Sequence, residues 1–111
     1  MADCLFCNMV TGKVPTDKIY EDDHIFVIKD IRPKATVHLL VIPKLHIDSV
    51  AEVKEEHAPL LGYMMVSLKN FAKEQGLDAF RTIVNTGKGS GQEVFHLHFH
   101  LLGGSNLPGF K

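Results

Sequence analysis

The most constraining feature of this sequence is a strict alternation of histidines with apolar residues. In the run His96-Leu97-His98-Phe99-His100-Leu101-Leu102, three successive alternate positions are histidines. A period of two is typical of an extended strand with two unlike faces, whereas a helix would scatter these histidines around its axis. The pattern predicts one apolar face and one face of imidazoles. Because alternate strand residues repeat at roughly 6.6 Å, His96 and His100 should lie about 13 Å apart at the backbone. That separation is too large for all three rings to share one metal ion.

The remaining sequence is typical of a small globular protein. Its 111 residues, 45% of them hydrophobic, are enough for one core, so we expect a single domain over residues 1–111. The net charge of −1 gives no electrostatic basis for binding a long nucleic acid. We find neither a secretion signal nor a membrane span, which predicts a cytoplasmic protein that does not contact membranes. Cys4-x-x-Cys7 favours half of a metal site or a redox pair over a disulfide framework.

The spacing of apolar residues predicts an α+β fold. A short helix is expected from Cys4 to Val10, and a long one around the apolar positions of residues 60–72, with Gly76 as its C-cap. Apolar runs at 19–21, 25–29, 37–42 and 80–85 predict strands, the first two joined as a hairpin. Pro43 should stop the third strand, which we expect to be buried on both faces. With the histidine strand, this makes an antiparallel sheet of about five strands, one long helix and a short N-terminal helix. In the turn-rich tail, Phe110 is the expected anchor.

A glycine-rich segment, Thr86-Gly87-Lys88-Gly89-Ser90-Gly91-Gln92, leads directly into the histidine run. Glycines let backbone N–H groups approach an anion closely, although a tight hairpin would be equally rich in glycine. A neutral imidazole acts as a nucleophile or exchanges protons near pH 7, and a second imidazole can protonate a leaving group. Three histidines on one strand face are poorly explained as core residues, because each buried ring needs its own polar partner. The combination favours phosphoryl or nucleotidyl transfer.

These residues resemble the signature of the histidine triad (HIT) family, His-φ-His-φ-His-φ-φ with φ apolar. The resemblance extends through Asp30-Ile31-x-Pro33, the segment from His38 to His46, and the segment from Asn85 to His96. The compact length and the Gly103-Gly104 pair resemble the Hint branch, the histidine triad nucleotide-binding proteins. The resemblance implies a HIT-like fold, a homodimer, and binding of purine nucleotides or nucleoside phosphoramidates.

The resemblance also implies a role for each site residue. His98 would attack an α-phosphate to form a nucleotidyl-histidine, His100 would contact the phosphate and assist the leaving group, and His38 would join their proton network. Asp30 would bind the ribose hydroxyls. Glu93 stands where many animal members carry serine, so no hydroxyl contact to the phosphate is implied there. The phosphate would be lined by Asn85, Gly91, Gln92, Glu93 and Val94, and the base slot by Leu5, Phe6, Met9, Ile28 and Ile31.

The implied reaction is hydrolysis of purine nucleoside phosphoramidates, which releases AMP or GMP without a catalytic metal. His100 favours hydrolysis, because the similar uridylyltransferases carry Gln at that position. The alternatives are a dinucleoside polyphosphate hydrolase and a nucleotide-binding or scaffolding protein with negligible turnover. Two others are a catalytic metal site among the histidines and a CxxC oxidoreductase, the last without the surrounding βαβ pattern that it needs.

Zinc-carrying members of the family combine two cysteines with the histidine after Pro-Lys-x and the first triad histidine. By this resemblance, Cys4, Cys7, His46 and His96 would bind a structural zinc that ties the first helix to the sheet. The alternative is a pair of free thiols beside hydrogen-bonded histidines.

Overall fold

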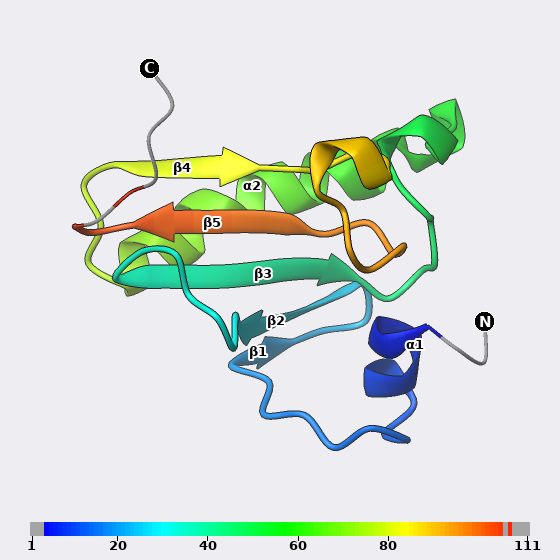
Figure 1. Cartoon of the computed structure of the whole chain (residues 1–111), viewed down its shortest axis with the longest axis horizontal. Helices are drawn as coiled ribbons and strands as arrows, with labels where there is room; N and C mark the ends of the chain where they lie inside the picture. Colours follow the sequence, from blue (N-terminus) through cyan, green and yellow to red (C-terminus); the bar gives the residue numbers. More distant parts are fainter. Residues whose placement is uncertain (1–3, 106, 108–111) are drawn as a thin grey trace.

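The computed structural model describes residues 4–105 and residue 107. Its helices are α1 (Leu5–Val10) and α2 (Ala58–Glu74), and its strands are β1 (Tyr20–Glu21), β2 (Ile25–Lys29), β3 (Val37–Pro43), β4 (Phe80–Ile83) and β5 (Phe99–Gly103). Three short 3-10 turns lie at Val50–Glu52, Glu55–His57 and Lys88–Ser90. The strands form one antiparallel sheet in the order β1-β2-β3-β5-β4, with α2 packed against one face, behind the sheet in Figure 1. The predicted α+β architecture is confirmed, whereas Phe110 lies outside the described residues.

The sheet separates two apolar clusters, because strand side chains alternate between faces. The cluster on the α2 side contains Leu39 and Val41 of β3, together with Leu97, Phe99 and Leu101 around β5. The cluster on the α1 side contains Phe6 of α1 and Leu40 and Ile42 of β3, together with Phe26 and Ile28 of β2. The histidines alternate with members of the α2 cluster, so their side chains point toward α1. The central strand is buried on both faces as predicted, with every residue from His38 to Pro43 buried.

The elements differ from the sequence predictions at their ends. β5 starts at Phe99, so His96 and His98 precede the paired strand, in a segment anchored by a 2.6 Å hydrogen bond from the Leu97 N–H to the Ile47 carbonyl. Alternation therefore predicted the facing of the histidines correctly but overestimated the length of the paired strand. The third strand was predicted to end at Ile42, before Pro43, but Pro43 is itself the last residue of β3 and lies opposite Ile25.

The helix ends follow simple chemistry. Cys4 caps α1, since its sulfur accepts a hydrogen bond from the Cys7 N–H at 3.3 Å. Pro59 occupies the first turn of α2, where its missing N–H costs nothing. Gln75 caps the other end of α2, and Gly76, the expected cap, follows it with a φ of 74°. No helix in the described part of the chain is long and apolar enough to cross a membrane, and the cytoplasmic location stays a prediction.

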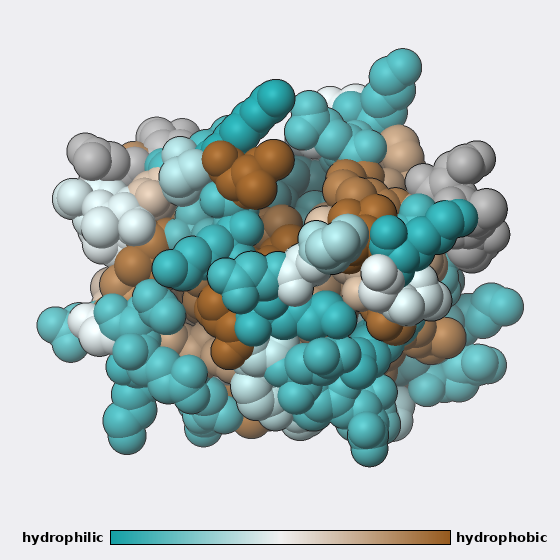
Figure 2. Space-filling view, turned by 90° about the horizontal axis from the view of Figure 1, so that it is seen from below, coloured by the Kyte–Doolittle hydropathy of each residue, from teal (hydrophilic) through white to brown (hydrophobic). Residues whose placement is uncertain are grey.

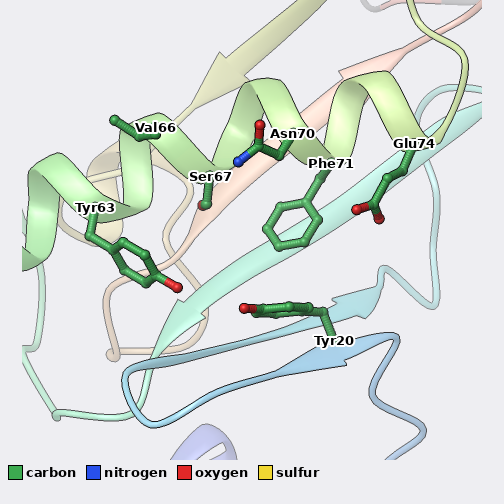
Figure 3. Close-up of a pocket in the computed structure, with 7 residues that line it drawn as sticks. All are labelled: Tyr20, Tyr63, Val66, Ser67, Asn70, Phe71 and Glu74. Carbon is green, nitrogen blue, oxygen red and sulfur yellow. The ribbon is translucent and has the colours of Figure 1, made fainter.

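Asp22 connects the hairpin of β1 and β2 to α2. Its carboxylate accepts hydrogen bonds from the backbone N–H groups of His24 (2.7 Å) and Ile25 (2.9 Å) and from the hydroxyls of Tyr20 (2.9 Å) and Tyr63. A shallow groove lies between β1 and α2 (Figure 3), on the α2 side of the sheet and therefore away from the histidines. It is lined by Tyr20, Tyr63, Val66, Ser67, Asn70, Phe71 and Glu74.

The surface is unevenly apolar. The face seen from below Figure 1 is largely hydrophilic, with separate hydrophobic patches (Figure 2). Among the exposed apolar residues, Met65 and Val66 of α2 are each 56% exposed, and Phe80 of the edge strand β4 is 40% exposed.

Candidate active site and metal centre

His98 is held as a neutral imidazole with one free nitrogen. Its Nδ1 lies 2.7 Å from the backbone carbonyl oxygen of His96. A carbonyl oxygen only accepts, so Nδ1 carries the proton and Nε2 keeps its lone pair. His98 is buried, and burial lowers the pKa of its imidazole. This arrangement is that of a nucleophile with a fixed tautomer.

His38 and His100 form a directed hydrogen-bonded pair beside His98. The backbone N–H of Lys34 donates to His38 Nδ1 at 3.1 Å, so the proton of neutral His38 is on Nε2. That N–H lies 2.9 Å from His100 Nδ1 and 3.3 Å from a carboxylate oxygen of Asp30. His100 Nδ1 is therefore the acceptor, and neutral His100 carries its proton on Nε2. The His98 and His100 ring centroids lie 5.0 Å apart.

The electrostatic environment keeps this pair neutral. Burial is the largest cause that lowers the pKa of His38, and Lys34 lowers it further while Asp30 opposes the change. Burial, followed by the neighbouring His98 and His38, lowers the pKa of His100 to about 4. Near neutral pH both rings are uncharged, which suits groups that pass protons rather than hold a permanent charge.

Phe6 of α1 packs against the histidine run. Its ring meets the His98 ring edge-on at 5.1 Å and the His96 ring at 5.7 Å between centroids. Of the predicted base-slot residues, the structure brings Phe6, Met9 and Ile28 into one apolar cluster. Leu5 and Ile31 lie outside it and are 42% and 91% exposed.

The glycine-rich segment is shaped by Gln92, whose side chain is buried within it. The Gln92 amide oxygen accepts from the Gly87 N–H at 2.8 Å, and its amide nitrogen donates to the carbonyls of Asp48 (2.8 Å) and Val94 (3.0 Å). Gly87 and Gly91 adopt φ values of 87° and 102°, which other residues rarely adopt. These hydrogen bonds of Gln92 fix the conformation of the loop and join it to the segment after β3. Among the other predicted phosphate residues, Glu93 is exposed, Asn85 is half-buried, and Val94 packs against the α1 cluster.

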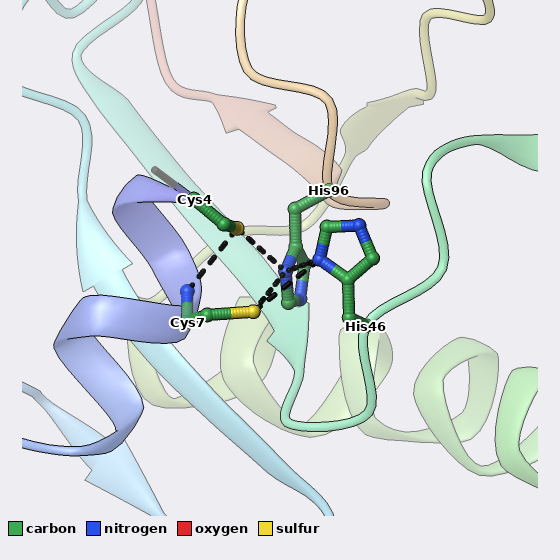
Figure 4. A group of neighbouring side chains, drawn as sticks. All are labelled: Cys4, Cys7, His46 and His96. Carbon is green, nitrogen blue, oxygen red and sulfur yellow. Dashed lines mark hydrogen bonds between the residues drawn. The ribbon is translucent and has the colours of Figure 1, made fainter. Parts of the chain in front are cut away.

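The four predicted metal ligands converge between α1 and the histidine run (Figure 4). Their donor atoms all lie within 4.8 Å of one another. His96 Nδ1 lies 3.3 Å from the Cys4 sulfur, 3.5 Å from the Cys7 sulfur and 3.1 Å from His46 Nδ1. The Cys7 sulfur lies 3.3 Å from His46 Nδ1. The cluster could hold a metal ion with two sulfur and two nitrogen ligands.

The Nε2 atoms of His46 and His96 make hydrogen bonds that leave both Nδ1 atoms free to bind a cation. His96 Nε2 donates to the Pro43 carbonyl at 2.7 Å, and His46 Nε2 lies 2.5 Å from an Asp48 carboxylate oxygen. Both Nδ1 atoms therefore present lone pairs, and their 3.1 Å contact is no hydrogen bond. Burial lowers the pKa of His96 to about 4, which keeps it neutral as a ligand must be. Without a cation, burial and Cys4 raise the pKa of Cys7 to about 11, so its thiol proton would face the histidines.

A second group, Asp30, His38 and His100, also brings three potential ligands within 4.8 Å. Its hydrogen bonds differ in kind, because His38 Nε2 carries a proton fixed by the Lys34 N–H at the opposite nitrogen. A cation there would compete with that proton. The two clusters are therefore chemically distinct, although both contain paired histidines.

Three partners in these clusters were not found by sequence reasoning. Two are backbone groups, the Lys34 N–H and the Pro43 carbonyl, which no side-chain pattern reveals. The third, Asp48, lies two residues beyond His46, where a carboxylate able to orient a ligand histidine was a usable signal.

Comparison with known proteins agrees with this geometry. Residues 3–110 match the family model described as "Scavenger mRNA decapping enzyme C-term binding". Protein HitA from Neisseria gonorrhoeae is 51% identical over 104 residues, which are 93% of this chain and 97% of that protein. The purine nucleoside phosphoramidase of Escherichia coli K12 is 38% identical over 107 residues, which are 95% of this chain and 90% of that protein.

Solved structures extend the likeness to three dimensions. A histidine triad protein from Clostridium difficile matches with a TM-score of 0.92 at 40% identity, covering 100% of this chain and 98% of that one. A HIT family hydrolase from Clostridium thermocellum has a TM-score of 0.92 at 39% identity, with coverage of 99% and 97%. The fold and the histidine run thus define a HIT-fold domain. The chain belongs to the histidine triad family, within its hydrolases.

Proposed function

We propose that this protein hydrolyses purine nucleoside phosphoramidates through a nucleotidyl-histidine intermediate on His98. The observation that carries the proposal is the fixed tautomer of His98, whose Nδ1 proton is held by the His96 carbonyl while Nε2 stays free. An E. coli relative with 38% identity is named a purine nucleoside phosphoramidase, which supports this substrate class.

The chemistry divides into two displacements. His98 Nε2 attacks the α-phosphorus as the P–N bond breaks, and the leaving nitrogen takes a proton from the His38–His100 pair. The negative charge of the entering phosphate raises the pKa of His100, so the pair acquires that proton when substrate binds. Water then attacks the phosphorus, the P–N bond to His98 breaks, and the nucleoside monophosphate leaves. The proton released by this water returns to the pair, which balances the cycle.

Binding of the nucleotide uses residues around this centre. Asp30 accepts hydrogen bonds from the ribose hydroxyls, and the base lies against the apolar residues Leu5, Phe6, Met9, Ile28 and Ile31. The phosphate lies against the glycine-rich loop, where Asn85, Gly91, Gln92, Glu93 and Val94 line it and backbone N–H groups stabilise developing charge.

The proposal includes a structural zinc on Cys4, Cys7, His46 and His96 and no metal among the catalytic histidines. The tautomers of His46 and His96 support the first part, and the proton on His38 Nε2 supports the second. Zinc bound there would join α1 to the segment that carries His98. Protein purified without added zinc should contain close to one equivalent. Less than about a tenth of an equivalent, with both thiols freely titratable, would contradict this part.

The proposal also includes a homodimer. Met65 and Val66 of α2 and Phe80 of the edge strand β4 expose apolar surface that a second copy could cover. The mass measured by light scattering should be twice that of the 12.4 kDa chain. A monomer at micromolar concentration would contradict it.

The enzymatic proposal is tested with an adenosine phosphoramidate. The wild type should release AMP, and His98→Ala should lose this activity while the protein keeps its folded spectrum. Mass spectrometry of acid-quenched wild type should detect the adenylated protein. If the wild type is no faster than His98→Ala, the protein binds nucleotides without turning them over. Loss of turnover with a chelator, while the fold survives, would instead favour a catalytic metal.

A further inference from the structure

Lys34 lies in the loop between β2 and β3, beside the proton-carrying pair. Its backbone N–H makes the 3.1 Å hydrogen bond to His38 Nδ1, which places this residue next to the active site. The residue itself is exposed. Within residues 4–105, no ion pair is found for its ammonium, while Asp30 pairs with His38. Two charged residues thus contact His38: Asp30 through its carboxylate, and Lys34 through its backbone, while the Lys34 ammonium makes no ion pair within residues 4–105.

The charge of Lys34 acts on the catalytic pair. It lowers the pKa of both His38 and His100, whereas Asp30 raises both. Lys29, a neighbouring exposed lysine at the end of β2, contributes to neither shift. Because β2 side chains alternate and Ile28 faces α1, Lys29 points toward the opposite face of the sheet. Of these two exposed lysines, Lys34 is the one whose charge acts on His38 and His100.

We propose that Lys34 is a specificity-determining residue, which favours nucleotide substrates whose leaving group carries a carboxylate or a phosphate. This inference rests on the proposed function, since it assigns the leaving-group class for that reaction. The geometry behind it is the position of the Lys34 backbone against His38, the contact of His38 with His100, and the exposure of the Lys34 side chain.

The size of the effect follows from the exposure of Lys34. An ammonium in contact with water attracts an anion at about 6 Å with an energy worth roughly three- to tenfold in kcat/KM. A neutral leaving group of the same size receives none of this attraction. The preference should weaken as salt is added, because exposed charges are screened.

The experiment compares matched substrates in the full-length protein. Three adenosine phosphoramidates carry glycine, glycinamide or phosphoethanolamine as the leaving amine, which present a carboxylate, no charge and a phosphate. Lys34→Gln removes the charge and keeps the backbone N–H to His38. Lys29→Gln is the same chemical change on the opposite face of the sheet and serves as the control.

The expected result is a roughly three- to tenfold loss of kcat/KM in Lys34→Gln for the glycine substrate, with the glycinamide substrate changed by less than about twofold. Lys34→Glu should lower the ratio of glycine to glycinamide further, and Lys29→Gln should leave it unchanged. Loss with only one of the two anions identifies which group Lys34 selects. An equal loss for charged and neutral substrates would overturn the inference, since Lys34 would then act on the phosphate that all substrates share. An unchanged ratio would overturn it as well. Turnover no faster than that of His98→Ala with every substrate would overturn the proposed function itself.

Discussion

Replacing Phe6 should separate support of the nucleophile from ordinary core packing. Phe6 is only 3% exposed and meets the rings of both His96 and His98 edge-on. It lies between Cys4 and Cys7 in the sequence, and its ring brings α1 into contact with His98, the proposed nucleophile. Phe6→Leu keeps an apolar residue in the cluster but removes both ring contacts.

The magnitude follows from those two contacts. Each edge-on aromatic contact is worth about 0.5–1.5 kcal/mol beyond the buried area, so Phe6→Leu should lower the free energy of unfolding by about 1–3 kcal/mol. The His98 ring also loses one of its neighbours, and small misplacements of a reacting group are costly. We therefore expect kcat/KM for an adenosine phosphoramidate to fall roughly tenfold.

The control is Phe26→Leu. Phe26 lies in the same apolar cluster and is fully buried, but its ring contact is with the Lys18 ammonium at 5.5 Å rather than with a histidine. Urea unfolding should show a loss of about 1–2 kcal/mol for this variant, with activity within about twofold of the wild type. Equal losses of activity in the two variants would refute the reasoning, because packing alone would then explain the effect of Phe6.

Three further predictions concern stability. The pKa of His100 is lowered from 6.5 to about 4 in the folded protein, so the unfolded chain binds more protons between these values. Stability is therefore lost as pH falls below 6.5, and because the ring is partly exposed the loss at pH 5 should be about 1 kcal/mol. Urea unfolding at pH 7.5 and 5 should show that His100→Gln lacks this loss. Gly104→Ala should lower the free energy of unfolding by about 1–3 kcal/mol more than Gly12→Ala, since both glycines have a φ of 83° but only at Gly104 would the new Cβ lie 2.7 Å from another side chain. Equal thermal shifts in the two variants would contradict this. Asp22→Ala should cost about 2 kcal/mol by loss of four hydrogen bonds, whereas the exposed Asp23→Ala should change the urea midpoint little.

Which side of the sheet each residue of the histidine run faces was predictable, because side chains alternate along an extended strand. Alternation alone placed the histidines opposite Leu97, Phe99 and Leu101, and the structure confirms that these apolar residues face α2. The extent of pairing was not predictable. The alternation of side chains continues through His96 and His98, but His96 lies in a bend and neither residue belongs to β5. A hydrogen bond from the Leu97 N–H to the Ile47 carbonyl anchors this segment.

The convergence of the four metal ligands was predictable only through family resemblance. Spacing along the chain says nothing about the approach of Cys4 and Cys7 to His46 and His96, which depends on how α1 packs beneath the sheet. The role of Gln92 was also out of reach. Family resemblance places Gln92 at the phosphate, but it does not reveal that the Gln92 amide also bonds to the loop and to Asp48 and is buried there. The partners of the Gln92 amide depend on how the loop packs against Asp48, which the sequence does not show.

The histidines differ in role because different backbone groups fix their protons. A carbonyl holds a proton on the outer nitrogen of His96, which turns a lone pair toward the cysteines, and another carbonyl holds the Nδ1 proton of His98, which frees Nε2 for attack. At His38 the partner is a backbone N–H, so the opposite nitrogen carries the proton and can only donate. Chemically identical side chains are thus suited to the three proposed roles of metal ligand, nucleophile and proton donor. Because these partners are backbone groups, side-chain substitutions around the site leave the assignment intact, and a change in backbone path should alter it.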